Sequence, residues 1–138
     1  MQVYHSYKLI KSEELNHHGT LFAGRTAEIF VESGFVAAGM EVGNPNQIVL
    51  VKIHSMTFTK PIPKGDLIHM QSRVVGLGKS SLTVHISISS ILGFTPVEGF
   101  ITYVNVGPGG VKMPHGLTLD STEDPVELEL RKQAAALR

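Results

Sequence analysis

The chain has 138 residues and a mass of 15.0 kDa, the size of one domain. Twelve basic residues balance twelve acidic ones and form no dense basic block, so nucleic acid is not an expected partner. Cysteine is absent, which excludes disulfides, thiolate metal sites and a cysteine nucleophile. The first eleven residues lack the unbroken apolar stretch of a signal peptide, and no apolar run is long enough to span a bilayer. We therefore expect a cytoplasmic protein that does not bind membranes.

Hydrophobic periodicity predicts most of the elements. Residues 3–10 alternate as a first strand, and residues 23–40 carry apolar side chains at helical spacing around most of the circumference, which predicts a buried helix. Turn residues at 43–46 separate this helix from a region with a period of two. The strands predicted in that region are residues 47–59, 67–75, 82–89 and 96–106.

The C-terminal residues predict a short second helix. Asp124 suits the N-cap, Pro125 the first helical position, and Glu127 follows three residues after the cap, as in a capping box. We expect one domain over residues 1–138, with residues 120–138 as a C-terminal helical tail. The expected fold class is α+β, an antiparallel sheet wrapped around one long central helix.

A charged stripe interrupts the long helix. Arg25, Glu28 and Glu32 project within about a sixth of a turn of one another. The stripe is consistent with a solvent-facing strip in which Arg25 and Glu28 neutralise each other. It is also consistent with a carboxylate held beside a ligand cavity, where desolvation raises a carboxyl pKa toward a range useful for general-base catalysis.

The loop before the helix, residues 16–24, is a second candidate site. Its small and polar residues lead into a helix start whose free backbone amides suit a developing oxyanion. The same residues suit a plain connection in which Asn16 or Thr20 caps the helix and Gly19 turns the chain. His17 and His18 are adjacent, but no third ligand is near them in the sequence, so no metal site is expected.

The segment from Gly76 to Ser81 superficially resembles a phosphate-binding loop. A Walker motif requires glycine at the position of Arg73 and a helix after Ser81, whereas a strand pattern follows. The segment is either a simple turn or a turn whose amides, Lys79 and hydroxyls contact a phosphorylated ligand. No serine lies in a G-x-S-x-G motif, which argues against a serine hydrolase.

From about residue 7 to residue 113 the chain resembles the hotdog-fold acyl-CoA thioesterases. The most specific part is Leu-Asn-His-His-Gly-Thr-Leu-Phe-Ala-Gly at residues 15–24, which is similar to the start of that family's central helix. Supporting motifs follow in the same order and at similar spacing. They are Met-Thr-Phe at 56–58, Lys-Pro at 60–61, Gly-Asp at 65–66, Val-Gly-Leu-Gly-Lys-Ser-Ser at 75–81 and Phe-Ile-Thr-Tyr-Val at 100–104.

The resemblance implies a hotdog fold, hydrolysis of acyl-coenzyme A, and homodimers joined edge to edge with active sites at the dimer interface. Tetramers or hexamers of such dimers are also compatible with it. It implies that Asn16 assists catalysis from the entry loop of the other subunit and that the backbone amides of Ala23 and Gly24 polarise the thioester carbonyl. It further implies that the turn at Gly78, Lys79, Ser80 and Ser81 contacts coenzyme A, which is part of the substrate, so that no cofactor is required.

The acidic residue of the family's helix falls on Val31 in this chain. Glu32 follows one residue later, which rotates its side chain by about 100° around the helix. Glu32 is the expected catalytic base, acting with Asn16 on a water molecule; another group is an alternative. The alternative function is a non-catalytic acyl-CoA-binding or regulatory protein, and a dehydratase or other acyl-thioester enzyme of the same fold is a third.

Overall fold

The computed structural model describes residues 1–137 and contains every strand and helix predicted above, with small shifts in their ends. Neither helix in that range is long and apolar enough to cross a membrane. The strands are β1 (Tyr4–Leu9), β2 (Ile48–Phe58), β3 (Leu67–Leu77), β4 (Ser81–Ser90) and β5 (Val97–Asn105). The helices are α1 (Ala23–Val42) and α2 (Pro125–Ala136), with short 3₁₀ turns η1 (Ser12–Glu14), η2 (Pro45–Gln47) and η3 (Pro108–Gly110).

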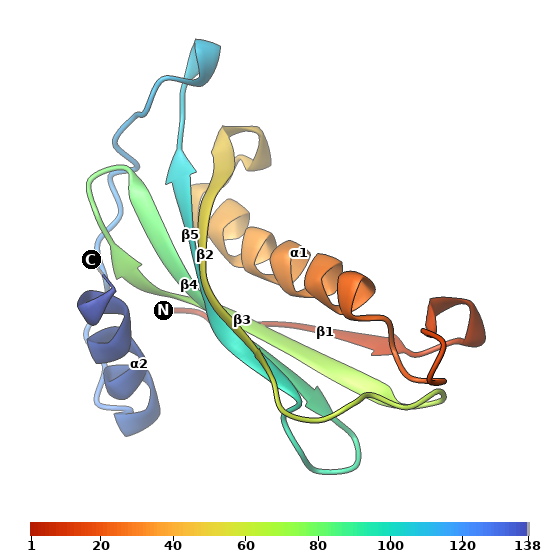
Figure 1. Cartoon of the computed structure of the whole chain (residues 1–138). Helices are drawn as coiled ribbons and strands as arrows, with labels where there is room; N and C mark the ends of the chain where they lie inside the picture. The colour runs from red at the N-terminus through yellow and green to blue at the C-terminus, as the bar shows by residue number, and fades with distance from the viewer. Residues whose placement is uncertain (138) are drawn as a thin grey trace.

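The five strands form one antiparallel sheet in the order β1-β3-β4-β5-β2. The sheet curves along α1, which lies across its concave face (Figure 1). This is the arrangement expected of a hotdog fold. The edge strands are β1 and β2, and β2 presents Val49, Val51 and Ile53 to solvent.

Alternation along the strands creates the core between the sheet and α1. In β4, Leu82, Val84, Ile86 and Ile88 are fully buried, and the small residues of α1 allow the helix to lie close to them. Gly34 shows how close this approach is, because a Cβ at that position would lie 3.0 Å from the terminal methyl of Ile86.

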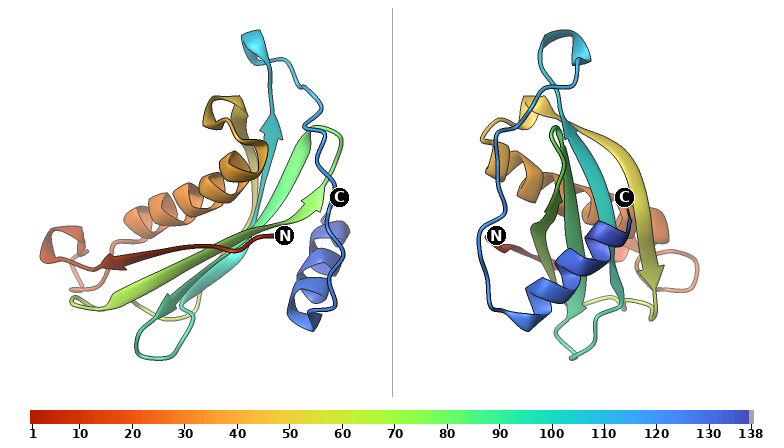
Figure 2. Two further views of the ribbon diagram at one scale, coloured as in Figure 1. Left: turned by 180° about the vertical axis from the view of Figure 1, so that it is seen from behind. Right: turned by 90° about the vertical axis from the view of Figure 1, so that its left-hand side faces the viewer.

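The prediction that α1 is buried around most of its circumference is only partly correct. Its sheet-facing residues, such as Phe30 and Ala37, are buried, but Glu28, Glu32, Val36 and Met40 are exposed. The sheet covers one side of the helix, and no other element within residues 1–137 covers the opposite side (Figure 2). Apolar side chains on that side leave a surface that a partner subunit would cover.

Helix α2 packs on the opposite face of the sheet from α1 (Figure 2). Leu130 and Ala134 are buried against Val75 of β3 and Phe100 of β5. Asp124 caps the helix as predicted, its carboxylate accepting a hydrogen bond of 3.0 Å from the backbone N–H of Val126.

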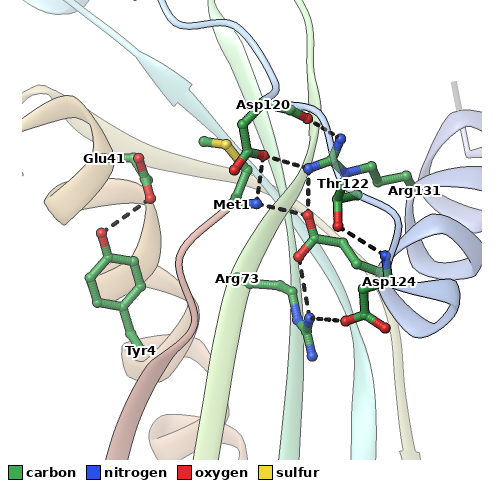
Figure 3. A network of polar contacts seen from close by, with 9 residues as sticks. Met1, Tyr4, Glu41, Arg73, Asp120, Thr122, Asp124 and Arg131 are labelled. Carbon is green, nitrogen blue, oxygen red and sulfur yellow. Dashed lines mark hydrogen bonds and ion pairs between the residues drawn. The ribbon is translucent and has the colours of Figure 1, made fainter.

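The predicted capping box at α2 does not form, because the carboxylate of Glu127 has stronger partners. It accepts from Arg73 at 3.2 Å and from the Met1 amino group at 2.7 Å, and it also pairs with Arg131. Asp120 joins the same network through Arg131 and Met1 (Figure 3). The network ties α2 to the sheet, a role that sequence reasoning left open.

Candidate active site

The loop before α1 is organised by the side chain of Asn16. Its Oδ1 accepts from the backbone N–H groups of His18 at 2.9 Å and Thr20 at 3.2 Å, while Gly19 takes a positive φ of 80°. Its Nδ2 donates to the Thr20 hydroxyl at 3.1 Å. An amide nitrogen carries two hydrogens, so a second donor remains on a side chain that these bonds hold in place.

The same loop is fastened to the connection between β2 and β3. The backbone N–H of Leu21 donates to the carbonyl of Ile62 at 2.8 Å, and Thr20 forms an isolated β-bridge with Pro63. The N–H of Phe22 donates to the carbonyl of Glu14 at 3.0 Å. The position of Asn16 relative to the helix start is therefore determined by backbone hydrogen bonds on two sides.

Helix α1 begins without a side-chain cap. Its N-cap residue is Phe22, so neither Asn16 nor Thr20 caps the helix, contrary to one interpretation of the sequence. The first intrahelical backbone bond runs from Thr26 to Phe22 at 3.0 Å, which leaves the N–H groups of the first helical residues, Ala23 and Gly24, without helical acceptors. Free amides at the positive end of a long helix are suited to bind a developing negative charge.

Asn16 and Ala23 line a common cavity of about 320 Å³. The wall from the loop and the helix start is partly polar, and the wall from the end of the sheet is mainly apolar. The lining residues are Asn16, Thr20, Leu21, Ala23, Thr26, Phe58, Thr59, Lys60, Pro61, Ile62 and Val97. Gly24 lines a different cavity of about 510 Å³, together with Phe22 and Glu28.

Glu32 is not brought to Asn16 within one chain. It is exposed on α1 and lines a separate cavity of about 360 Å³ beside β1, with Tyr7, Lys8 and Arg25. It also lies nine residues beyond Ala23, or about 14 Å along the helix. The sequence-based expectation of a desolvated carboxylate is therefore not met in the single chain, because the sheet does not extend over this side of α1.

Val31 is rotated about 100° around the helix from Glu32. Its carbonyl accepts a 2.7 Å hydrogen bond from the buried Tyr103 hydroxyl of β5, and the neighbouring Phe35 ring meets the Tyr103 ring edge-on at 6.1 Å. The Val31 side chain is partly buried against the core, on the apolar stripe of Gly24, Ala27, Val31 and Phe35. The carboxylate nearest to Val31 along this stripe is Glu28, which lies one turn before it.

The turn predicted to contact coenzyme A connects β3 to β4, far from Asn16 in the same chain. Figure 1 shows this turn and the start of α1 at opposite ends of the molecule. The carbonyl of Ser80 in this turn accepts a hydrogen bond from the backbone N–H of Asn105, which pairs with Ile48 at the beginning of β2. The Asn16 cavity, in contrast, includes Phe58 at the end of β2. The Lys79 side chain is exposed, and the structure keeps Gly78 and Ser81 together through a 3.0 Å backbone bond.

Ion pairs surround the helix start on the side away from the cavity. The predicted pair of Arg25 with Glu28 is confirmed at 3.4 Å, but Arg25 also meets Glu14 at 3.4 Å, and Lys8 meets Glu14 at 3.0 Å. Burial alone would raise the pKa of Glu14, but hydrogen bonds from Lys8, the Lys11 backbone and Arg25 hold it below its ordinary value. Sequence reasoning missed Glu14, because its partners come from three separate segments.

No group of three or more histidine, cysteine, aspartate or glutamate side chains converges in a metal-binding arrangement within residues 1–137. The rings of His17 and His18 lie 3.9 Å apart at their centroids, tilted by 43°, without an additional ligand.

Comparison with known proteins agrees with this geometry. Residues 18–91 match the family described as the thioesterase superfamily. The acyl-CoA thioester hydrolase YciA of Salmonella typhimurium is 27% identical over 109 residues, which cover 73% of this chain and 80% of that protein.

Solved structures show the same fold. The acyl-CoA hydrolase from Staphylococcus aureus, in complex with butyryl-coenzyme A and coenzyme A, superposes with a TM-score of 0.86 at 24% identity, covering 97% of this chain and 80% of that one. An apo-hexameric acyl-CoA thioesterase has a TM-score of 0.79 at 26% identity, covering 99% and 94%. The hotdog arrangement, the motif order and a family match over more than half of the residues lead to one conclusion: this chain belongs to the thioesterase superfamily.

Proposed function

We propose that the protein hydrolyses acyl-coenzyme A to a free acid and coenzyme A. The observation that carries this proposal is the uncapped start of α1 beside the fixed amide of Asn16, with Asn16 and Ala23 on one cavity. These are the donors that a thioester carbonyl needs as it becomes an oxyanion. The relatives named above are acyl-CoA thioester hydrolases, which supports the same substrate class.

The proposed reaction uses water as the nucleophile. The water oxygen forms a bond to the thioester carbon and transfers a proton to a carboxylate, for which Glu32 of the second subunit is the proposed base. The carbonyl oxygen becomes an oxyanion, stabilised by the amides of Ala23 and Gly24 and by the amide of Asn16. The carbon–sulfur bond then breaks, and coenzyme A leaves as a thiol after its sulfur receives a proton. Water and the substrate supply all the atoms, so the proposal requires no cofactor.

A homodimer would complete this site. Strand β2 is an unpaired edge of eleven residues with exposed apolar side chains, which is a surface that pairs readily with another strand. Antiparallel pairing of two β2 strands about a twofold axis places the beginning of one β2 beside the end of the other. The turn at Lys79 lies near the beginning of β2 and the Asn16 cavity lies at its end, so each cavity would receive the turn of the second subunit.

A subunit-mixing experiment tests this shared site. The Asn16→Ala homodimer and the Lys79→Glu homodimer are each expected to hydrolyse acyl-CoA poorly at low substrate concentration. After subunit exchange, one site of each heterodimer carries both changes and the other carries neither. Recovery of about a quarter of wild-type activity is expected from a random 1:1 mixture. Exchange without any recovery would contradict a site that combines Asn16 of one subunit with Lys79 of the other.

The alternative function is binding of acyl-CoA without hydrolysis. It is favoured by one observation, the apolar stripe at Val31, the position to which the resemblance assigns the family's acid. Such a protein would bind a thioester tightly and release no coenzyme A. The cytoplasmic location expected from the sequence remains a prediction.

Release of free coenzyme A from short, medium, long-chain and aryl thioesters tests the proposed function. We expect Asn16→Ala and Glu32→Ala each to lower turnover about a hundredfold while the fold is retained. Glu129→Ala is the control, because Glu129 is an exposed carboxylate on helix α2, on the opposite face of the sheet from α1. Identification of the products separates hydrolysis from dehydration. Full activity in Glu32→Ala would remove Glu32 from the mechanism, and binding without turnover in the wild type would favour the alternative.

A further inference from the structure

We infer that the Asn16 cavity holds the acyl group and restricts the enzyme to short, uncharged acyl chains, with Ile62 and Phe58 limiting their length. The inference rests on the proposed function for the class of substrate, but the cavity and its walls come from the structure. Asn16 and Ala23, whose amides would bind the carbonyl, line this cavity together with the apolar residues Leu21, Ile62 and Val97, so the acyl chain attached to that carbonyl would contact these apolar side chains.

The apolar wall is assembled from side chains that are almost completely buried. Leu21 is 6% exposed, Ile62 is 3% exposed and Val97 is 1% exposed, and they come from three segments distant in sequence. Phe58 lies beside them, paired with Val97 across the β2–β5 ladder, and remains half exposed. An acyl chain is the part of a thioester that gains from contact with such a wall.

The wall has little freedom to move away from a longer chain. Ile62 stands between Pro61 and Pro63, whose rings restrict the backbone on both sides. Its carbonyl accepts from Leu21 at 2.8 Å, and Pro63 bridges to Thr20. Because backbone hydrogen bonds and two prolines hold this wall in place, we expect a sharp limit on the length of the acyl chain rather than a gradual decline in activity with length.

The small volume of the cavity favours a short acyl chain. A volume of about 320 Å³ lies at the small end of ligand pockets. It accommodates about ten groups of the size of a water molecule, at about 30 Å³ each. The carbonyl, the sulfur and the adjoining atoms of the thioester use part of this space, which leaves room for an acyl chain of about four to six carbons.

The charges around the cavity favour a neutral acyl group. Among residues 1–137, the lining includes no carboxylate, and its one charged residue, Lys60, places its ammonium group 4.5 Å above the ring of Phe94. That interaction holds the Lys60 charge on an aromatic face that is not part of the lining. A carboxylate at the end of an acyl chain that contacts Leu21, Ile62 and Val97 would lose its hydration without gaining a polar partner from these side chains.

The test measures kcat/KM for straight-chain acyl-CoA substrates from two to twelve carbons. The wild type is expected to lose about tenfold or more between six and ten carbons. Phe58→Ala removes a half-exposed wall residue and Ile62→Val removes one methyl group, and each is expected to raise the ratio of ten-carbon to four-carbon activity about tenfold. Ile10→Val is the matched control, because Ile10 is as buried as Ile62 but does not line the cavity, and its profile is expected to stay unchanged.

A second measurement separates this inference from the proposed function. Binding of S-alkyl-CoA thioethers of the same lengths, which cannot be hydrolysed, reports on the cavity without catalysis. Suppose that thioether binding shows a chain-length limit, that Phe58→Ala relaxes this limit, and that no thioester is hydrolysed. This result would support the acyl pocket and reject the thioesterase activity. Hydrolysis with a length profile that neither variant changes would reject the acyl pocket alone. If the protein neither binds the thioethers nor hydrolyses any thioester, both the acyl pocket and the thioesterase activity are rejected.

Discussion

The hydroxyl of Tyr103 donates a 2.7 Å hydrogen bond to the carbonyl oxygen of Val31, joining the middle of β5 to the middle of α1. Burial raises the pKa of Tyr103, so the hydroxyl remains a neutral donor across the ordinary pH range. The bond lies at the turn of α1 that also carries Glu32. A Cβ at Gly34 would lie 2.6 Å from the Tyr103 hydroxyl oxygen, so this contact depends on a glycine in the helix.

This contact makes the effects of two substitutions interdependent. Tyr103→Phe should lower the free energy of unfolding by about 1 kcal/mol, because it removes one buried hydrogen bond. Gly34→Ala should lower it by about 1 to 3 kcal/mol through overpacking. Urea titration of both single variants and the double variant should show a combined loss smaller than the sum, since removal of the hydroxyl makes room for the methyl group. Additive losses would indicate that Ile86, rather than Tyr103, is the obstacle.

The position of the catalytic carboxylate can be tested by moving it one residue. If Glu32 is the base, Glu32→Gln should lower kcat about a hundredfold with a smaller change in KM. Val31→Asp in that background should restore activity at least about tenfold, because it puts a carboxylate at the position to which the resemblance assigns the acidic residue of the family. Val31→Asn controls for polarity without a base. Equal activity of the Asp and Asn variants would show that a carboxylate at position 31 does not replace Glu32, and full activity of Glu32→Gln would contradict a carboxylate requirement at position 32.

The helix start should be sensitive to the side chain at residue 24. A Cβ there would lie 2.5 Å from the Phe22 ring, and the exposed ring can move to relieve that contact. Gly24→Ala should therefore change the free energy of unfolding by less than about 1 kcal/mol, while kcat/KM falls about tenfold as the displaced ring and new methyl group narrow the approach to the amides. In a Phe22→Ala background the loss should be smaller. Unchanged kinetics in both backgrounds would exclude the Gly24 amide from the reaction.

The network around Glu127 predicts acid sensitivity. Burial alone would raise the pKa of Glu127, but hydrogen bonds from the Met1 amino group, Arg131 and Arg73 lower it below the ordinary value of 4.5. A carboxyl group with a lowered pKa in the folded state contributes stability that is present above the ordinary pKa and is lost as the pH falls through the folded-state pKa. Wild-type stability should therefore decrease below about pH 4.5.

Glu127→Gln is the variant that checks this assignment. It should be less stable than the wild type at pH 7, by about 3 kcal/mol, because Arg73 and Arg131 lose the buried charged partner that they share. Chemical denaturation at pH 7 and pH 3 should show the difference between the two proteins shrinking at the lower pH. A difference that stays constant over this range would show that another group controls acid stability.

The sequence predicted the elements well where one face of a strand or helix is buried. Leu82, Val84, Ile86 and Ile88 alternate in β4 as expected, and Asp124 begins α2. Alternation identifies which side chains share a face, but it does not identify which strands pair, so the order of the sheet was not predicted from periodicity. The position of α2 was also not predicted, because Glu127 binds Arg73, which is 54 residues away in sequence.

The sequence predicted the separate segments of the candidate site but not how these segments lie relative to one another. The loop at Asn16 and the helix start at Ala23 are local features of the sequence, and the structure places them on one cavity. Glu32 and Lys79 lie elsewhere on the surface of the chain, which is what the proposal of a site shared between two subunits requires. Their roles remain predictions that the mixing and substitution experiments address.

The most direct test of the central claim is the rate at which wild-type protein and Asn16→Ala release free coenzyme A from butyryl-CoA. The account predicts steady hydrolysis by the wild type and a rate about a hundredfold lower for the variant, with the same thermal unfolding profile for both. Binding of butyryl-CoA by the wild type without release of coenzyme A, or equal rates in the two proteins, would contradict it.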